Sequence, residues 1–142
     1  MPERAVGAPP RPASAQTFLA FDYGRKRTGV AGGARLLGRA EPRGTIRAEG
    51  DARWQQIGKL IEQWQPEALV VGVPFHPDGA SHENTQAARR FARQLHGRFG
   101  LPVFEVDERY STTEARAQGA DDAGIDAASA CIILEQFWRE HP

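Results

Sequence analysis

The sequence predicts an α/β fold: a mixed β-sheet with helices on both faces. Buried-strand patterns appear at "TFLAFDY", "ALVVGVP" and "LPVFEVD", and stripes of apolar residues at helical spacing lie between and after them. Strand patterns cluster in the first third of the chain and then alternate with helices, which indicates a mixed rather than an all-parallel sheet. The length of 142 residues fits one domain.

The N-terminal part predicts a leader followed by three strands. Residues 1–16, rich in proline and alanine without a period, are expected to be a disordered leader, and residues 17–142 form the domain. "TFLAFDY" is apolar on both faces, as in a central strand, and Asp22 stands at its exit. Glycine-punctuated segments at 27–34 and 38–46 predict two more strands in an antiparallel meander. Gly24 and the cations after it form the first hairpin.

Helical spacing predicts the remaining elements. A first stripe predicts a helix over 51–65, closed by Pro66; its members are Trp54, Ile57, Ile61 and Trp64. A second stripe follows the loop 75–84 and consists of Ala88, Phe91, Leu95 and Phe99. An exposed basic strip lies beside it, formed by Arg89, Arg93 and His96. Ser111 and Glu114 predict a short capped helix, and a final amphipathic helix carries Ala130, Ile133, Leu134 and Phe137.

Composition narrows the function classes. One cysteine makes no internal disulfide, and no signal peptide pattern is present, so we expect a reduced, cytoplasmic setting. Apolar runs such as 68–71 are far shorter than the roughly 20 residues that span a bilayer, so we expect no membrane association. The net charge is zero, but residues 1–53 carry a balance of +5 and residues 101–142 one of −6. Such asymmetry fits a phosphate-binding surface beside an acidic metal site, or simply two differing solvated faces.

Acidic residues at three positions are candidates for a catalytic site, and each of them also has a purely structural interpretation. Asp22 ends a buried strand, where aspartate commonly starts a turn. Asp107 and Glu108 end another buried strand, where loop acids are common. Asp126 can cap the last helix, with Ile125 as a hydrophobic staple.

Taken together, the acids indicate more than their separate positions do. Strand exits of an α/β sheet gather at one edge, so Asp22 and Glu108 can converge there. Asp126 lies four, seven and eleven residues before apolar positions of the last helix and therefore points along its inward face. Crowded carboxylates raise their own pKa values unless cations are present. Two Mg²⁺ or Mn²⁺ ions would solve that problem and would support phosphodiester hydrolysis.

Four segments in order resemble the signature motifs of the YqgF/RuvX family: "FDYGRKRTGVA", "LVVGVPFHPDG", "VDERYSTTEA" and "DAASACIILEQF". The similarity covers nearly everything from Thr17 to Trp138. The resemblance implies a ribonuclease H-like fold with three antiparallel strands followed by two parallel ones. It also implies a relation to Holliday-junction resolvases and a nuclease that matures the 5′ end of the small-subunit ribosomal RNA precursor, pre-16S rRNA.

The resemblance also assigns roles to residues. It makes Asp22, Glu108 and Asp126 the catalytic acids and metal ligands, with Asp107 as a further ligand. Candidate phosphate contacts lie in the first hairpin, the third motif and the basic strip; they are Arg25, Lys26, Arg27, Arg109, Arg89 and Arg93. The loop before the last helix, "GADDAG", is short and acidic where many family members have a longer basic one. The strip on the second helix is therefore a substitute grip on the substrate, or else a solvated helix face.

Several functions remain open on sequence alone. The leading hypothesis is a metal-dependent nuclease acting on structured precursor ribosomal RNA through activated water. The same chemistry fits branched DNA, for which paired cuts require a homodimer; the sequence allows a monomer or a homodimer. A non-catalytic RNA-binding factor of ribosome biogenesis would use the acids as caps and turns. An aspartate-x-glycine hairpin also opens actin-like ATPase domains, but those need two such domains and a longer chain.

Overall fold

A five-stranded mixed sheet organises the protein. The structure is a computed structural model that describes residues 15–75, 84–108 and 122–142. The sheet consists of β1 (Thr17–Asp22), β2 (Thr28–Ala34), β3 (Glu41–Ile46), β4 (Ala68–Val73) and β5 (Val103–Asp107). Their spatial order is β3-β2-β1-β4-β5. Strands β3, β2 and β1 pair antiparallel, and β1, β4 and β5 pair parallel, which confirms the predicted arrangement.

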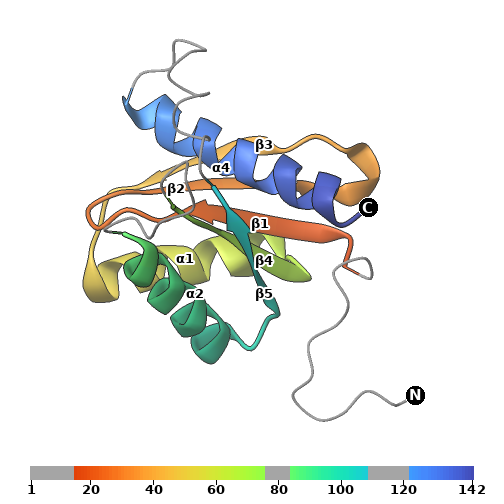
Figure 1. Ribbon diagram of the computed structural model, residues 1–142. Helices are drawn as coiled ribbons and strands as arrows, with labels where there is room; N and C mark the ends of the chain where they lie inside the picture. The colour runs from red at the N-terminus through yellow and green to blue at the C-terminus, as the bar shows by residue number, and fades with distance from the viewer. Residues whose placement is uncertain (1–14, 76–83, 109–121) are drawn as a thin grey trace.

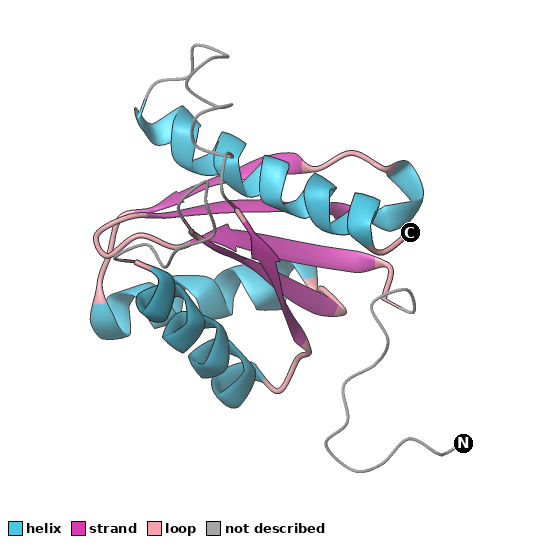
Figure 2. Ribbon diagram, viewed as in Figure 1, coloured by secondary structure: helices cyan, strands magenta, loops and turns pink. Residues whose placement is uncertain are grey.

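Helices cover both faces of this sheet (Figure 1). On one face lies α4 (Asp122–Glu140), and on the other lie α1 (Gly50–Trp64) and α2 (Thr85–Phe99). Figure 2 shows the same layers by element type. Successive side chains of β1 point to opposite faces of the sheet. Phe18 and Ala20 pack with Phe137 of α4, whereas Leu19 and Phe21 pack with the apolar residues of α1 and α2. Each face therefore has its own apolar core.

Several observed boundaries differ from the expected ones by a few residues. Strand β3 begins at Glu41 rather than at residue 38, because a 3-10 turn (Arg35–Leu37) precedes it and ends at Gly38, whose φ is 67°. Helix α1 begins and ends one residue early, since Gln65 adopts a left-handed φ of 47° and caps it. Helix α4 begins at Asp122, so Asp126 lies inside it. The reading of Asp126 as the cap of that helix is therefore wrong.

Other expectations concern residues outside the described ranges. They are residues 1–14 of the leader expected over 1–16, residues 76–83 of the loop expected at 75–84, and the short helix expected at 111–119. From Ala15 onward the chain contacts the sheet: Ala15 is buried, and its carbonyl oxygen accepts a hydrogen bond from Arg35. Within the described part of the chain, no helix is both long and apolar enough to cross a membrane.

Candidate active site

Asp22 and Glu108 come from two strands that are not neighbours. Asp22 is the last residue of β1, Glu108 directly follows β5, and β4 lies between them. The three strands run parallel, so their carboxyl ends share one edge of the sheet. The backbone N–H of Glu108 donates to the carbonyl of Val73 at 3.0 Å, which holds Glu108 beside the end of β4. The fold thus brings both acids to one place.

Gly72 on β4 makes the contact between them possible. A Cβ atom at Gly72 would lie 2.0 Å from Oε2 of Glu108 and 2.4 Å from Cδ1 of Ile133. The carboxyl group of Glu108 therefore occupies the space that a side chain at position 72 would fill. It crosses β4 there and interacts with Asp22 as a hydrogen-bonded pair of carboxyl groups.

Asp126 reaches the same edge from the helix above. In the β1–β2 ladder Asp22 is paired with Gly29. A Cβ atom at Gly29 would lie 1.9 Å from the backbone oxygen of Asp126, so α4 rests on bare backbone at this point. The absence of a side chain at position 29 lets the helix approach closely enough to place Asp126 beside Asp22.

Asp22 and Glu108, which are partly covered by the surrounding residues, have strongly raised pKa values. Burial, followed by the negative charge of Asp126, raises the pKa of Asp22 to about 7, although the hydrogen bond with Glu108 opposes part of that rise. Burial and then the charge of Asp22 raise the pKa of Glu108 to about 9, with the hydrogen bond that protonated Glu108 donates to Asp22 and the charge of Asp107 as smaller causes. Near neutral pH the pair therefore retains a proton.

One cation of the predicted hairpin reaches this cluster. Nε of Arg27 lies 3.2 Å from Oδ2 of Asp126, and the side chain of Asp126 is only 16% exposed. Arg25 and Lys26 are exposed at the tip of the hairpin. The hairpin therefore carries one arginine that neutralises a site carboxylate and two cations that face solvent.

The sequence reading missed Arg53, which holds this hairpin in place. Arg53 is buried on α1, and its guanidinium donates to the carbonyl oxygens of Ala48, Gly24 and Arg25. Its Cζ also lies 4.8 Å from the centre of the Tyr23 ring. In the sequence, Arg53 is only a charged residue next to the apolar stripe of a helix. Such residues are common in amphipathic helices, so the sequence offered no reason to single it out.

The other predicted site residues lie apart from the three acids. Asp107 is exposed at the end of β5, and its charge is one of the causes that raise the pKa of Glu108. Arg89 and Arg93 belong to α2, on the face of the sheet opposite α4. Arg89 pairs with Glu105 at 3.6 Å and stacks over Phe75, and Arg93 is exposed. Arg109 lies outside the described residues.

The donor chemistry of the site fits a hard divalent cation. All three side chains offer carboxylate oxygens, the donors that Mg²⁺ and Mn²⁺ prefer. Oε2 of Glu108 is a buried oxygen for which the described residues supply no hydrogen-bond donor. In the described ranges, however, no three acidic, histidine or cysteine side chains are already arranged around one point as a metal cage. Arg27 pairs with Asp126 at 3.2 Å, and the raised pKa values of Asp22 and Glu108 favour a protonated pair near neutral pH.

Known proteins are similar to this chain in sequence. The sequence model of the family described as "RuvX: Holliday junction resolvase" matches residues 16–140. A protein of Albidiferax ferrireducens is 70% identical over 127 residues, 89% of this chain and 80% of the relative. A protein of a Polaromonas species is 68% identical over 130 residues, 92% of this chain and 93% of the relative. Both are named "Putative pre-16S rRNA nuclease".

Solved structures with much lower identity show the same fold. The structure described as "T. thermophilus RuvC in complex with Holliday junction substrate" superposes with a TM-score of 0.55 at 13% identity, over 88% of this chain and 95% of that one. Archaeoglobus fulgidus Pelota superposes with a TM-score of 0.50 at 11% identity, over 90% of this chain and 35% of that one. The described sheet and its helices are thus of the RuvC, ribonuclease H-like type.

Proposed function

The chain belongs to the RuvX family, and from that premise we propose that it is a nuclease that hydrolyses phosphodiester bonds in the maturation of pre-16S rRNA. One observation carries the proposal: Asp22, Glu108 and Asp126 arrive from three separate elements and meet at one edge of the sheet. Burying acids together is unfavourable for stability, so a role in chemistry accounts for their convergence better than turn or cap roles do.

We infer that Asp22, Glu108 and Asp126 hold Mg²⁺ or Mn²⁺, with Asp107 near enough to add negative charge. A divalent cation bound there supplies Lewis acidity, which polarises the scissile phosphate and lowers the pKa of the attacking water. The proton shared by Asp22 and Glu108 must leave when both carboxylates serve as ligands. Metal affinity is therefore expected to rise with pH across the neutral range.

The cations of the hairpin have a separate role in the proposal. Arg25 and Lys26, exposed beside the acids, contact the phosphates that flank the scissile bond. Arg27 stabilises the charge of Asp126 before substrate and metal arrive. Arg53 keeps the hairpin in position through its bonds to the carbonyl groups of Gly24 and Arg25. Arg109, in the motif that contains Glu108, is a further phosphate contact.

Cleavage assays test the proposal directly. A 5′ fragment of pre-16S rRNA and a four-way DNA junction are incubated with Mn²⁺, Mg²⁺ or EDTA, using wild type, Asp22→Asn and Glu108→Gln. Glu62→Gln, an exposed acid on α1, is the matched control. We expect metal-dependent cutting of the RNA that Asp22→Asn and Glu108→Gln abolish and Glu62→Gln leaves unchanged.

Other outcomes would redirect the assignment. Preferred cutting of the junction would make branched DNA the substrate. If neither substrate is cut, or if Asp22→Asn cuts as well as wild type at equal melting temperature, the catalytic assignment is wrong. RNA binding that survives replacement of all three acids would then identify a non-catalytic binding factor.

A further inference from the structure

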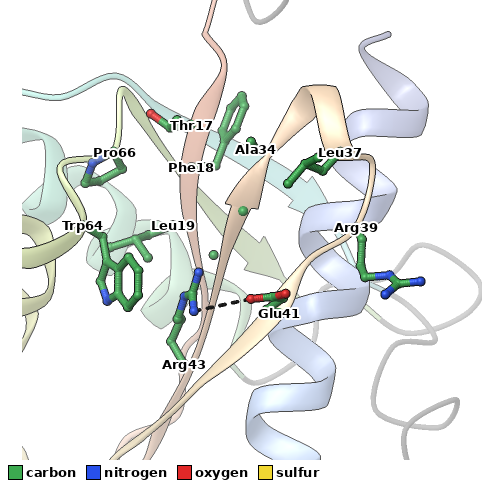
Figure 3. Close-up of a pocket in the computed structure, with 12 residues that line it drawn as sticks. Thr17, Phe18, Leu19, Ala34, Leu37, Arg39, Glu41, Arg43, Trp64 and Pro66 are labelled. Carbon is green, nitrogen blue, oxygen red and sulfur yellow. Dashed lines mark ion pairs between the residues drawn. The ribbon is translucent and has the colours of Figure 1, made fainter.

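A second hollow lies on the sheet face opposite the carboxylates. It has a volume of about 500 Å³ and is bounded by β2, β3 and the end of α1 (Figure 3). Leu19, which packs on the side of α1 and α2, contributes to its floor. Asp22 is three residues further along β1 and so faces the other side, as Phe18 and Ala20 do under α4. The hollow is therefore distinct from the candidate active site.

The local sequence explains why this part of the sheet is uncovered. Gly32 of β2 lines the floor and has no side chain to fill it. A Cβ atom at Gly32 would lie 3.0 Å from Cδ2 of Leu19 and 3.1 Å from Nε of Arg43, so a larger residue would narrow the hollow. Helix α1 ends at Trp64 and does not extend over it. The space is thus built into the fold.

The rim combines an aromatic ring with cations. The guanidinium of Arg43 lies over the ring of Trp64 at 3.8 Å, and Nη1 of Arg43 is 3.6 Å from Oε1 of Glu41. Nε of Arg43 is buried, and the described residues provide it with no hydrogen-bond partner. Arg39 stands at the outer end of the rim. A smaller hollow of about 270 Å³ continues along β3, shares Arg43 and adds Lys59.

The rim also remains open to solvent. Trp64 is 41% exposed and Leu37 is 78% exposed, which is unusual for large apolar side chains on one surface. Three cations, Arg39, Arg43 and Lys59, face a single acid, Glu41, along the two hollows. An aromatic platform in a positively charged groove is the arrangement with which proteins bind single-stranded nucleic acid without reading its sequence.

We propose that this groove binds single-stranded RNA, with one base stacked in the hollow at Trp64 and Arg43 and the backbone phosphates along Arg39 and Lys59. The inference rests on the proposed function, because it assigns the groove to the same RNA. The Arg43 guanidinium already lies on the Trp64 ring at 3.8 Å, so a base stacks against this pair rather than between its members. A flat base suits such a planar surface over a glycine floor better than a bulky aliphatic side chain does.

The position of the groove predicts which RNA molecules can use it. Leu19 and Asp22 are about 10 Å apart along β1, but their side chains point to opposite faces. A strand that contacts both sites must pass from one face of the sheet to the other. Only RNA that extends well beyond the scissile bond can do so, and the groove therefore increases affinity for long substrates and not for short ones.

Binding measurements test the groove without depending on cleavage. A labelled single-stranded RNA of about 12 nucleotides is titrated with protein in EDTA and followed by fluorescence anisotropy, with Asp22→Asn as the background. Trp64→Leu removes the stacking ring, Trp64→Phe retains an aromatic ring, and Arg43→Gln removes the charge above it. Arg90→Gln, an exposed arginine on α2, is the control for loss of one charge. Melting temperatures establish that each variant is folded.

We expect Trp64→Leu and Arg43→Gln to weaken RNA binding about 5- to 10-fold, and Trp64→Phe and Arg90→Gln to change it less than about twofold. Unchanged binding by Trp64→Leu would overturn the proposal. A labelled peptide of alternating leucine and glutamate is titrated in parallel; if it binds more tightly than the RNA and displaces it, the groove is a protein-docking surface and the proposal is wrong.

The two proposals fail in distinguishable ways. Trp64-dependent RNA binding by a protein that cuts no substrate would refute the nuclease function and support the groove. Cleavage of pre-16S rRNA by a protein whose RNA affinity is insensitive to Trp64 and Arg43 would support the nuclease function and refute the groove.

Discussion

Glu108 meets Asp22 across an intervening strand, and it does so through the space above Gly72. The two carboxyl groups are separated by more than eighty residues of chain and by the whole width of β4. Their contact depends on a position that carries no functional group of its own. Glycine 72 is therefore as necessary to the geometry of the site as the acids themselves.

Gly72→Ala is expected to inactivate the enzyme. The added methyl group would lie 2.0 Å from Oε2 of Glu108, so the carboxyl group must swing away from Asp22. Contact with Cδ1 of the buried Ile133 at 2.4 Å should lower the free energy of unfolding by about 1–2 kcal/mol. Cleavage rate and Mn²⁺ affinity, measured beside denaturant unfolding, check this. Retention of full activity and metal affinity would show that Glu108 does not need its present position.

Gly29→Ala should lower stability and move Asp126 away from Asp22. Its Cβ atom would lie 1.9 Å from a backbone oxygen of α4, and backbone cannot rotate aside as a side chain can, so the helix must shift. We expect a loss of about 3 kcal/mol in the free energy of unfolding. Gly97→Ala is the matched control, since it lies within α2 with open space around it. That variant should gain about 0.5–1 kcal/mol from helix propensity, and equal effects of the two changes would contradict the close packing.

The shared proton predicts how the stability of the metal-free protein depends on pH. The pKa of Asp22 is raised from 3.8 to about 7 and that of Glu108 from 4.5 to about 9, so the folded state binds more protons than the unfolded state between about pH 4 and 9. The free energy of unfolding contributed by the pair should therefore fall as pH rises through this window.

Asp22→Asn removes one of the two titrating groups and provides the comparison. In EDTA, the melting temperature of Asp22→Asn should exceed that of wild type by an amount that grows from pH 5 to pH 9. In wild type the carboxyl group becomes a partly buried charge as pH rises, whereas the amide of the variant stays uncharged. Thermal unfolding of both proteins across this range measures the difference. A constant difference, or one that shrinks with pH, would rule out a pair whose pKa values are raised.

Arg27→Gln should increase metal affinity while reducing cleavage. In the present arrangement the guanidinium is the cationic partner of Asp126, at 3.2 Å, and it competes for that carboxylate with any metal ion. Removing it frees Asp126 and lowers the local positive potential, and we expect Mn²⁺ to bind several-fold more tightly, measured by calorimetry. Arg25→Gln, an exposed neighbour in the hairpin, should change Mn²⁺ affinity less. Weaker Mn²⁺ binding by Arg27→Gln would mean that Asp126 is not a ligand.

Arg53→Lys should disturb the hairpin without altering an acid. Lysine keeps the charge, but it cannot reach the carbonyl groups of Ala48, Gly24 and Arg25 together as the guanidinium does. Leaving these partly buried acceptors without the guanidinium is expected to lower the free energy of unfolding by about 1–2 kcal/mol. The KM for RNA should rise more than kcat falls, because the exposed cations lose their position.

Arg98→Lys is the control for Arg53→Lys, since Arg98 is an exposed arginine that stacks on Trp54 at 4.4 Å. It should change the free energy of unfolding by less than about 0.5 kcal/mol and leave KM unaltered. An equal rise in KM for both variants would mean that Arg53 contributes only charge.

Local patterns predicted the elements of this protein well, and the reason is physical. Segments such as "TFLAFDY" and "ALVVGVP" are apolar on both faces, and only a central strand between two layers buries both. Helical stripes identified α1 within one residue at each end, and the second stripe lies within α2. The predicted ends of elements were wrong near Gly38 and Gln65, where the backbone adopts a left-handed conformation. Such a residue ends a helix or turn, but it leaves the spacing of apolar residues in the sequence unchanged, so the pattern does not reveal it.

The three acids could also be proposed as candidates from the sequence, because the end of a strand and the inward face of a helix can be recognised from local patterns. Their distances were not, because contact between Asp22, Glu108 and Asp126 depends on strand order and on the two glycines over which Glu108 and α4 approach. The cations of the hairpin and of α2 read alike in sequence, yet α2 packs on the face opposite α4.

The sequence by itself determined the strands, the helices and the acidic residues, since these follow from periodicity and residue chemistry along the chain. Only the tertiary structure decided which acids share a proton, that Arg27 rather than Arg89 pairs with a site carboxylate, and that Arg53 supports the hairpin. It also decided that Gly32, Arg43 and Trp64 enclose one groove. Such relations join residues that are distant in the chain, and they arise from the packing of whole elements, which no local pattern encodes.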